Sequence, residues 1–385
     1  MAAVANAIAR PSESSPARQF ELLLACCSNA YANASPEMFA GFEGESFAEL
    51  AIRHGVLPRV YERVASIGIP GKLRDTLRCR FETHTRRALC LTSELVRIID
   101  HLYARDISVL PYKGPVLAQM LYGNIAARQF GDLDLLVRSS DVGRVKTALQ
   151  ELGFTPTLQL SARGERAYVR SGYEYVFDRG RERNLVELHW RVAPRFYAVD
   201  FDIDGLFERS VSVELAGRSI ATLCPEDLLL VLCVHAAKHA WTNLSWLCDV
   251  GALADKVDWA VVSERARQLA IERVVAITFL LANTLLGAEI SVISCDDHAA
   301  SITNELAVVM REGRELDVES RDYFRLMTQV RERWRDRLRF VLRLAVTPTV
   351  TEWRSVRLPE KLLPLYTLVR VARVAARLRS GPSRQ

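Results

Sequence analysis

The chain has 385 residues, a formal net charge of +5, and contents of 49% hydrophobic and 25% charged residues. This composition is ordinary for a globular protein and excludes disordered and fibrous classes. Because no uninterrupted run of 18 apolar residues occurs, and residues 1–17 lack the compact apolar core of a signal peptide, we expect no membrane-spanning segment and a cytoplasmic location. None of the eight cysteines forms a Cys-x-x-Cys pair, so we expect buried free thiols.

The first part of the chain predicts a tail and a helical region. Residues 1–15 are rich in Ala, Ser and Pro, and we interpret them as a disordered tail. Amphipathic runs begin at Gln19 and at Phe47, and the segment from Leu73 to Tyr103 keeps helical spacing without Pro or Gly. We therefore assign residues 16–105 to an N-terminal helical region.

The second part, residues 106–224, alternates between strand and helix signals and then accumulates strands. The expected strands cover residues 107–112, 132–137, 154–158, 173–177, 185–190, 211–215 and 219–223. Short helices are expected over residues 116–122 and 141–152, the second of them closed by Gly153. This alternation predicts a small α+β domain built on a mixed sheet.

The third part, residues 225–385, is predicted to be helical with a basic end. Helices are expected over residues 225–241, 246–256, 258–269 and 272–286. From Arg321 to Gln385, sixteen Lys and Arg residues stand against five Asp and Glu residues. This end of the chain fits either an anionic partner or a set of solvated helix faces.

The candidate chemistry begins with the sequence Gly131-Asp132-Leu133-Asp134-Leu135-Leu136-Val137. In a strand, residues i and i+2 point to the same face, so Asp132 and Asp134 would project side by side while Leu133 and Leu135 enter the core. Two carboxylates this close repel each other unless a cation joins them. Oxygen ligands suit Mg²⁺, which proteins commonly share with substrate phosphates, although many strand ends simply carry two solvated acids.

Three neighbouring features strengthen the hypothesis of a phosphate-handling enzyme. Lys113-Gly114 precedes a helix, whose N-terminus favours phosphate, although a plain strand–turn–helix corner has the same pattern. Glu187 lies within an apolar strand and becomes a third carboxylate if that strand adjoins Asp134; otherwise it is a solvated acid. Arg128 would hold a phosphate, steady the carboxylates or remain an exposed loop residue.

Taken together, these motifs resemble the nucleotidyltransferase superfamily with the DNA polymerase β-type palm, and more narrowly a bacterial family of uncharacterised nucleotidyltransferases. The matching order is a strand, Lys-Gly, a helix, Arg-x-x-x-Asp-x-Asp-Leu-Leu-Val, a helix, and a strand with Glu-Leu-His-Trp. The resemblance covers roughly Leu91 to Val262 and includes His235–Trp241 and Leu244–Val250. It implies an α+β fold whose small mixed-sheet palm is flanked by N-terminal and C-terminal helical regions.

The resemblance also implies a reaction and its cofactors. Asp132 and Asp134 would hold Mg²⁺ on the phosphates of a nucleoside triphosphate such as ATP, and Glu187 would join them at a second Mg²⁺ and help ionise an acceptor hydroxyl. The nucleoside monophosphate would move to the acceptor and pyrophosphate would leave. The acceptor stays open among small molecules, peptides or proteins, and RNA.

Two further observations leave alternatives open. Lys238 and His239 would contact a nucleotide phosphate and shape the cleft, although His235 and His239 also have the i, i+4 spacing of a zinc site or of helix-packing histidines. The Gly-Ser pair that usually follows the first strand of such enzymes is replaced by Lys113-Gly114-Pro115. This departure supports a non-catalytic nucleotide- or partner-binding module on the same fold, and a toxin that modifies RNA or protein is a third hypothesis.

Overall fold

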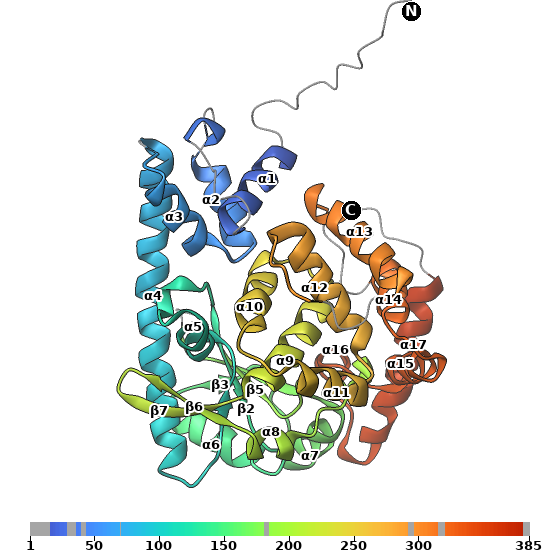
Figure 1. Ribbon diagram of the computed structural model, residues 1–385. Helices are drawn as coiled ribbons and strands as arrows, with labels where there is room; N and C mark the ends of the chain where they lie inside the picture. Colours follow the sequence, from blue (N-terminus) through green and yellow to red (C-terminus); the bar gives the residue numbers. More distant parts are fainter. Residues whose placement is uncertain are drawn as a thin grey trace, which may run out of the picture.

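The computed structural model describes residues 16–28, 36–39, 44–69, 71–180, 185–291, 296–314 and 320–379. Helices surround one small mixed sheet, which confirms the predicted α+β class with helical regions on both sides of a palm core (Figure 1). The expected tail of residues 1–15 lies outside the described residues. The domain boundaries proposed from the sequence stay predictions.

The N-terminal region is helical, as its apolar periodicity predicts. Its elements are α1 (Pro16–Cys27), η1 (Pro36–Phe39), α2 (Gly44–Arg53), α3 (Leu57–Ser66) and α4 (Lys72–Tyr103). Helix α4 has 32 residues and runs along one side of the molecule, from α2 and α3 down to the sheet (Figure 1). It thereby connects the N-terminal helices to the palm.

The palm sheet has five strands in the order β1-β2-β5-β4-β3. The strands are β1 (Leu110–Pro111), β2 (Asp132–Leu136), β3 (Thr155–Pro156), β4 (Glu174–Asp178) and β5 (Leu185–His189). Strands β2 and β5 pair in parallel, and the other neighbours pair antiparallel. The edge strands β1 and β3 are shorter than the sequence predicts, because each contains a proline that cannot donate to a strand ladder.

The remaining palm elements include the two predicted helices and the last two predicted strands, and they add α7, α8 and two short helices that the sequence did not predict. They are α5 (Gly114–Tyr122), η2 (Ile125–Ala127), α6 (Val142–Glu151), α7 (Ala162–Ser171), η4 (Arg195–Tyr197), α8 (Ile203–Glu208), β6 (Val211–Leu215) and β7 (Arg218–Thr222). Strands β6 and β7 form a separate hairpin around Ala216-Gly217, both of which have positive φ angles. Two residues with positive φ angles between antiparallel strands are typical of a tight hairpin turn.

The described part of the C-terminal region consists of helices joined by loops. Its elements are α9 (Pro225–Lys238), α10 (Leu244–Ala254), α11 (Trp259–Leu269), α12 (Glu272–Leu286), α13 (Asp297–Arg311), α14 (Arg321–Gln329), α15 (Trp334–Val346), α16 (Val350–Ser355), η5 (Glu360–Leu365) and α17 (Tyr366–Arg379). Helix α9 begins with Pro225 in its first turn and has acidic side chains near its N-terminus, both of which favour helix initiation there.

Strand β2 separates two clusters of buried apolar side chains among the described residues. Leu133 and Leu135 pack into a cluster with α4 and α6, whereas Leu136 packs on the opposite face with α9, α10 and the N-terminal helices. The two aspartates of β2 share the face of Leu136. The sheet thus presents its acidic residues toward the helical regions.

Two sequence-based expectations concern membranes and cysteines. Within the described ranges, no helix is both long enough and apolar enough to cross a membrane. The seven cysteines found there are all free; five are buried, while Cys79 and Cys90 are exposed on α4. Cys295 lies outside the described residues.

Candidate active site

The parallel pairing of β2 with β5 brings three carboxylates to one face of the sheet. Asp134 lies directly opposite Glu187 in the strand register, and Asp132 precedes Asp134 by two residues on the same face. Leu133 and Leu135 point the other way and are buried in the palm core. The sequence predicted Glu187 as a third carboxylate only if its strand adjoined Asp134, and the two strands are indeed neighbours.

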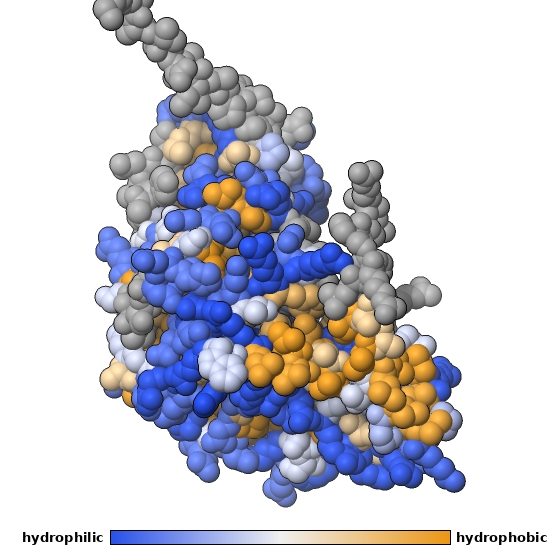
Figure 2. Space-filling view, turned by 90° about the vertical axis from the view of Figure 1, so that its right-hand side faces the viewer, coloured by the Kyte–Doolittle hydropathy of each residue, from blue (hydrophilic) through white to orange (hydrophobic). Residues whose placement is uncertain are grey.

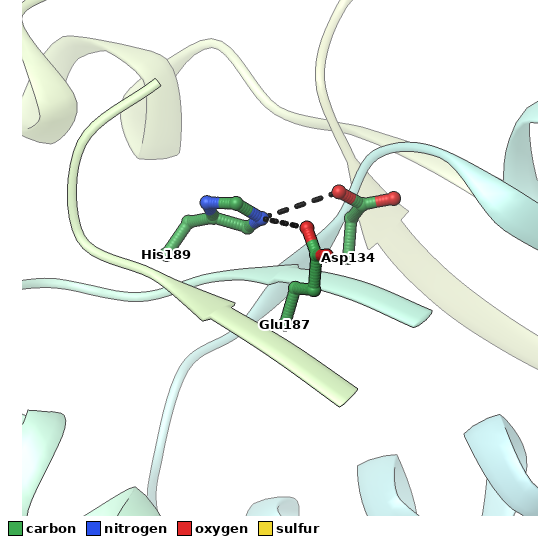
Figure 3. A group of neighbouring side chains, drawn as sticks. All are labelled: Asp134, Glu187 and His189. Atoms are coloured by element: carbon green, nitrogen blue, oxygen red, sulfur yellow. Dashed lines mark hydrogen bonds and ion pairs between the residues drawn. The ribbon is translucent and has the colours of Figure 1, made fainter. Parts of the chain in front are cut away.

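Asp134, Glu187 and His189 form a compact group in which the ligand atoms lie within 4.8 Å of one another (Figure 3). His189 Nε2 lies 3.2 Å from Asp134 Oδ1 and 3.4 Å from Glu187 Oε2. Its other nitrogen, Nδ1, is 3.6 Å from Glu174 Oε2, which is too long for a hydrogen bond. In the described part of the chain, no other group of three such side chains meets this criterion.

The charged side chains in this group shift one another's pKa values. Burial favours the neutral forms, but the Lys113 ammonium and His189 hold the pKa of Asp134 well below its usual value. The same carboxylates overcome the burial of His189 and raise its pKa to about 9. His189 is therefore an imidazolium at neutral pH, a cation that cannot ligate a metal through Nε2.

Asp132 is electrostatically different from Asp134. Among the described residues, none donates a hydrogen bond to its carboxylate or forms an ion pair with it, whereas Asp134 binds both Lys113 and His189. Burial and repulsion by Asp134 and Glu187 raise the pKa of Asp132 to about 6. Lys113 and Arg128 lower this pKa only in part, so repulsion between the carboxylates remains at Asp132.

Lys113 and Gly114 connect this cluster to the start of α5. Lys113 occupies the N-cap position, and its Nζ donates to Asp134 Oδ1 at 2.8 Å. Gly114 has a φ of 57°, and a Cβ built there would lie 3.3 Å from the carbonyl oxygen of Asp132. A glycine therefore lets the N-terminus of α5 pass close to β2.

The carboxylates open onto a cavity of about 710 Å³. Helix α4 contributes Arg80 and Arg87, which lie two turns apart along that helix. Arg87 Nη2 donates to the carbonyl oxygen of Gly131 at 2.9 Å, and Arg80 pairs with Glu45. The N-terminal helices therefore form one wall of the cavity.

The end of α9 forms another wall of the cavity. His235, His239 and Trp246 pack against one another with ring centroids 4.9–5.3 Å apart. Burial and the neighbouring Lys238 and Lys113 lower the pKa of His239 to about 3, and burial lowers that of His235 well below its usual value. Both imidazoles are thus neutral, and they pack as aromatic rings.

Lys238, which the sequence predicted to contact a nucleotide phosphate, also lies at this wall. Its Nζ lies 5.5 Å from the centre of the Tyr173 ring, and burial together with Lys113 lowers the pKa of its ammonium. Just after His239, Ala240 and Trp241 have φ angles of 51° and 53°, a conformation costing roughly 1–2 kcal/mol each. The bend lets α10 return so that Trp246 meets the two histidines.

Arg128 lines the cavity and forms a buried ion pair with Asp249 of α10. Its Nε donates to Asp249 Oδ2 at 2.8 Å, and the hydroxyl of Tyr122 donates to Asp249 Oδ1 at the same distance. Burial lowers the pKa of Arg128, but Asp249 outweighs it and the net change is upward. This geometry favours a positioning role, and contact with a nucleotide stays a prediction.

The structure adds residues that the sequence analysis did not assign to the site. Glu174 lies opposite His189 in the β4–β5 register, and Arg80 and Arg87 come from α4. An acid alternating with Tyr173 and Tyr175 was a usable signal for Glu174. The arginines gave none, because α4 carries many charged residues and only the tertiary fold selects those that meet the cavity.

Comparisons with known proteins bear on the identity of this fold. No curated protein matches the chain. The solution structure of the antibiotic-resistance factor ANT(2'')-Ia aligns with 47% of this chain and 94% of its own, at 14% identity and a TM-score of 0.33, which is too low to carry an argument. Residues 41–287, more than half of the chain, match a family model. The chain belongs to that family, the uncharacterised nucleotidyltransferases.

Proposed function

We propose that this protein transfers a nucleoside monophosphate from a nucleoside triphosphate to a hydroxyl of an acceptor, with release of pyrophosphate and dependence on Mg²⁺. The observation that carries the proposal is the register of β2 and β5, which sets Asp134 opposite Glu187 and Asp132 beside them. These carboxylates adjoin a cavity whose wall also contains Lys113, Lys238 and three arginines. A negative cluster within a basic cavity suits a metal–triphosphate complex.

The residues present fit a divalent cation. Asp132, Asp134 and Glu187 supply hard oxygen donors, and among the described residues Asp132 has no cationic partner of its own. His189 supports the set as a protonated neighbour that fixes Asp134 and Glu187. When bound, Mg²⁺ ions supply charge neutralisation and activate the attacking oxygen, and two ions are expected for this class of transfer.

The chain's other residues would bind and orient the nucleotide. Helix α5 begins at Gly114 beside the Lys113 ammonium, and a helix N-terminus and a nearby cation both favour phosphate oxygens. Lys238 would add a second positive charge from the end of α9, where burial and Lys113 lower the pKa of its ammonium and a bound phosphate would favour the protonated form. His239, neutral and packed on Trp246, would offer an aromatic surface to the base or sugar.

One observation favours a second candidate, a nucleotide-binding module without catalysis. Lys113-Gly114-Pro115 stands where enzymes of this kind usually have Gly-Ser, so the hydroxyl contact to phosphate is missing at that turn. Against this, the carboxylates share one face of the sheet and one of them has no cationic partner in the described part of the chain. The transferase therefore ranks first.

The test measures pyrophosphate release with each of the four nucleoside triphosphates and Mg²⁺, in the presence of a cell extract as the source of acceptors. Wild type is compared with Asp132→Asn/Asp134→Asn and with Asp255→Asn, a matched control at an exposed acid on another helix end. Release by wild type and the control alone supports the transferase. Nucleotide binding by calorimetry without release from any of the proteins supports the module.

A further inference from the structure

The C-terminal helices α15 and α17 present apolar side chains to solvent. Trp334, Leu338 and Leu342 on α15 are 67%, 49% and 55% exposed, and Leu368 on α17 is 62% exposed. Helices α15 and α17 pack against each other. Figure 2 shows a broad apolar area on the side of the molecule where Figure 1 draws α15 and α17. We call the exposed side chains of these two helices the C-terminal patch.

The charge of the C-terminal patch has one sign. The exposed residues of α15 are Trp334, Arg335, Arg337, Leu338, Arg339, Val341, Leu342 and Val346, and those of the described part of α17 are Leu368, Val371, Ala372, Ala375 and Ala376. Within this set, every side chain is either apolar or an arginine. The described surface of the patch therefore lacks both acidic and uncharged polar groups.

The opposite sides of the two helices are firmly packed. Phe340 of α15 and Tyr366 of α17 are 1% and 3% exposed. Arg343 pairs with Asp200, which also pairs with Arg339 at the edge of the patch, and the buried Glu352 pairs with Arg370. Because each helix already buries its other side, the apolar residues of the patch stay exposed when the chain is folded. Large exposed apolar areas on a folded protein mark interaction sites.

We propose that the C-terminal patch binds the surface of an anionic membrane. Apolar side chains, led by Trp334, would enter the boundary between headgroups and acyl chains, and the arginines would meet lipid phosphates. Helix α15 has 13 residues, so it can lie in the interface but cannot span it. A mixture of apolar and exclusively basic side chains is the composition that such a surface selects.

Charge complementarity decides against a second copy of this chain as the occupant. In a twofold contact the same patch meets itself, so Arg335 and Arg337 would face arginines across the interface. The patch supplies no acid to pair with them. An anionic bilayer provides both the apolar phase and the opposite charge. This inference does not depend on the proposed transferase activity.

The experiment is co-sedimentation of the full chain with two kinds of vesicle, one of phosphatidylcholine alone and one of phosphatidylcholine and phosphatidylserine in equal parts. Wild type is compared with Leu338→Glu/Leu368→Glu. The control is Leu89→Glu/Val308→Glu, which changes two apolar residues that are 56% and 47% exposed on α4 and α13. A third variant, Arg335→Gln, tests the charge.

We expect wild type and the control to bind the phosphatidylserine vesicles with a blue shift of tryptophan fluorescence, and to bind phosphatidylcholine at least tenfold more weakly. The patch variant should lose at least tenfold in binding while keeping the circular dichroism spectrum of wild type, and Arg335→Gln should bind several-fold more weakly. Absence of binding to anionic vesicles would overturn the proposal. So would equal losses in both double variants, or a dimer in light scattering that Leu338→Glu/Leu368→Glu dissolves.

Discussion

Two neighbouring groups of buried charge behave differently in this protein. Asp249 is 1% exposed, and its two oxygens accept from Arg128 and Tyr122, so its group is closed and balanced. The cluster around Asp134 contains more carboxylates than cations and opens onto the cavity. We infer from this difference that a buried carboxylate with hydrogen-bond partners for both oxygens stabilises the fold. An incompletely paired set at a cavity is arranged for a ligand.

The largest expected effect comes from Asp132→Asn. If Asp132 serves a metal ligand set, its loss should reduce pyrophosphate release on the order of 10³-fold, because metal coordination contributes several kcal/mol to such transfers. The free energy of unfolding should stay the same or rise, since the substitution removes repulsion from Asp134 and Glu187. Steady-state kinetics and urea unfolding measure the two effects. A variant with lower stability and full activity would contradict the assignment of Asp132 to a metal site.

Asp249→Asn should show the opposite pattern. Removing one partner of a buried ion pair leaves Arg128 uncompensated, which typically costs about 3–5 kcal/mol. We expect a loss of this size in urea unfolding, while the remaining folded protein keeps its metal-dependent nucleotide affinity. Asp100→Asn, at an exposed pair with Arg218, is the matched control and should change stability by less than about 0.5 kcal/mol. Equal losses in the two variants would remove the distinction between the groups.

The pH dependence of stability sharpens the comparison. The pKa of Asp132 is raised from 3.8 to about 6 in the folded protein, so the folded state holds its proton more tightly than the unfolded state. The associated stability is fully present below pH 3.8 and is lost as pH rises through 6. We expect wild type in EDTA to lose about 1–2 kcal/mol relative to Asp132→Asn between pH 5 and pH 7. Mg²⁺ should reverse this loss; a pH-independent difference would contradict the assignment.

The sequence alone predicted much of this arrangement, because local patterns determine it. Alternation of acids and leucines in β2 gave the facing of Asp132 and Asp134, and Glu187 was recognised as an expensive charge within an apolar strand. What could not be predicted depends on packing between distant segments. The sequence left the role of Arg128 open among a phosphate ligand, a support for the carboxylates and a loop residue, because its partner Asp249 comes from the distant α10. Helix α4 likewise gave no sign of which arginines meet the cavity.

The smallest expected effect concerns the turn that holds Lys113 beside β2. Gly114→Ala places a side chain at a φ of 57° and sets its Cβ 3.3 Å from the Asp132 carbonyl oxygen. The backbone alone should cost about 1–2 kcal/mol.

Gly123→Ala is the matched control, because Gly123 has a φ of 63° but no atom within 4 Å of its Cβ position. Both variants should therefore show the backbone cost in urea unfolding, but only Gly114→Ala should add the contact with Asp132 and displace the N-terminus of α5 from the carboxylates. We expect a several-fold rise in the KM for nucleotide in Gly114→Ala alone. The same KM in both variants would show that the approach of α5 to β2 serves the fold and not the substrate.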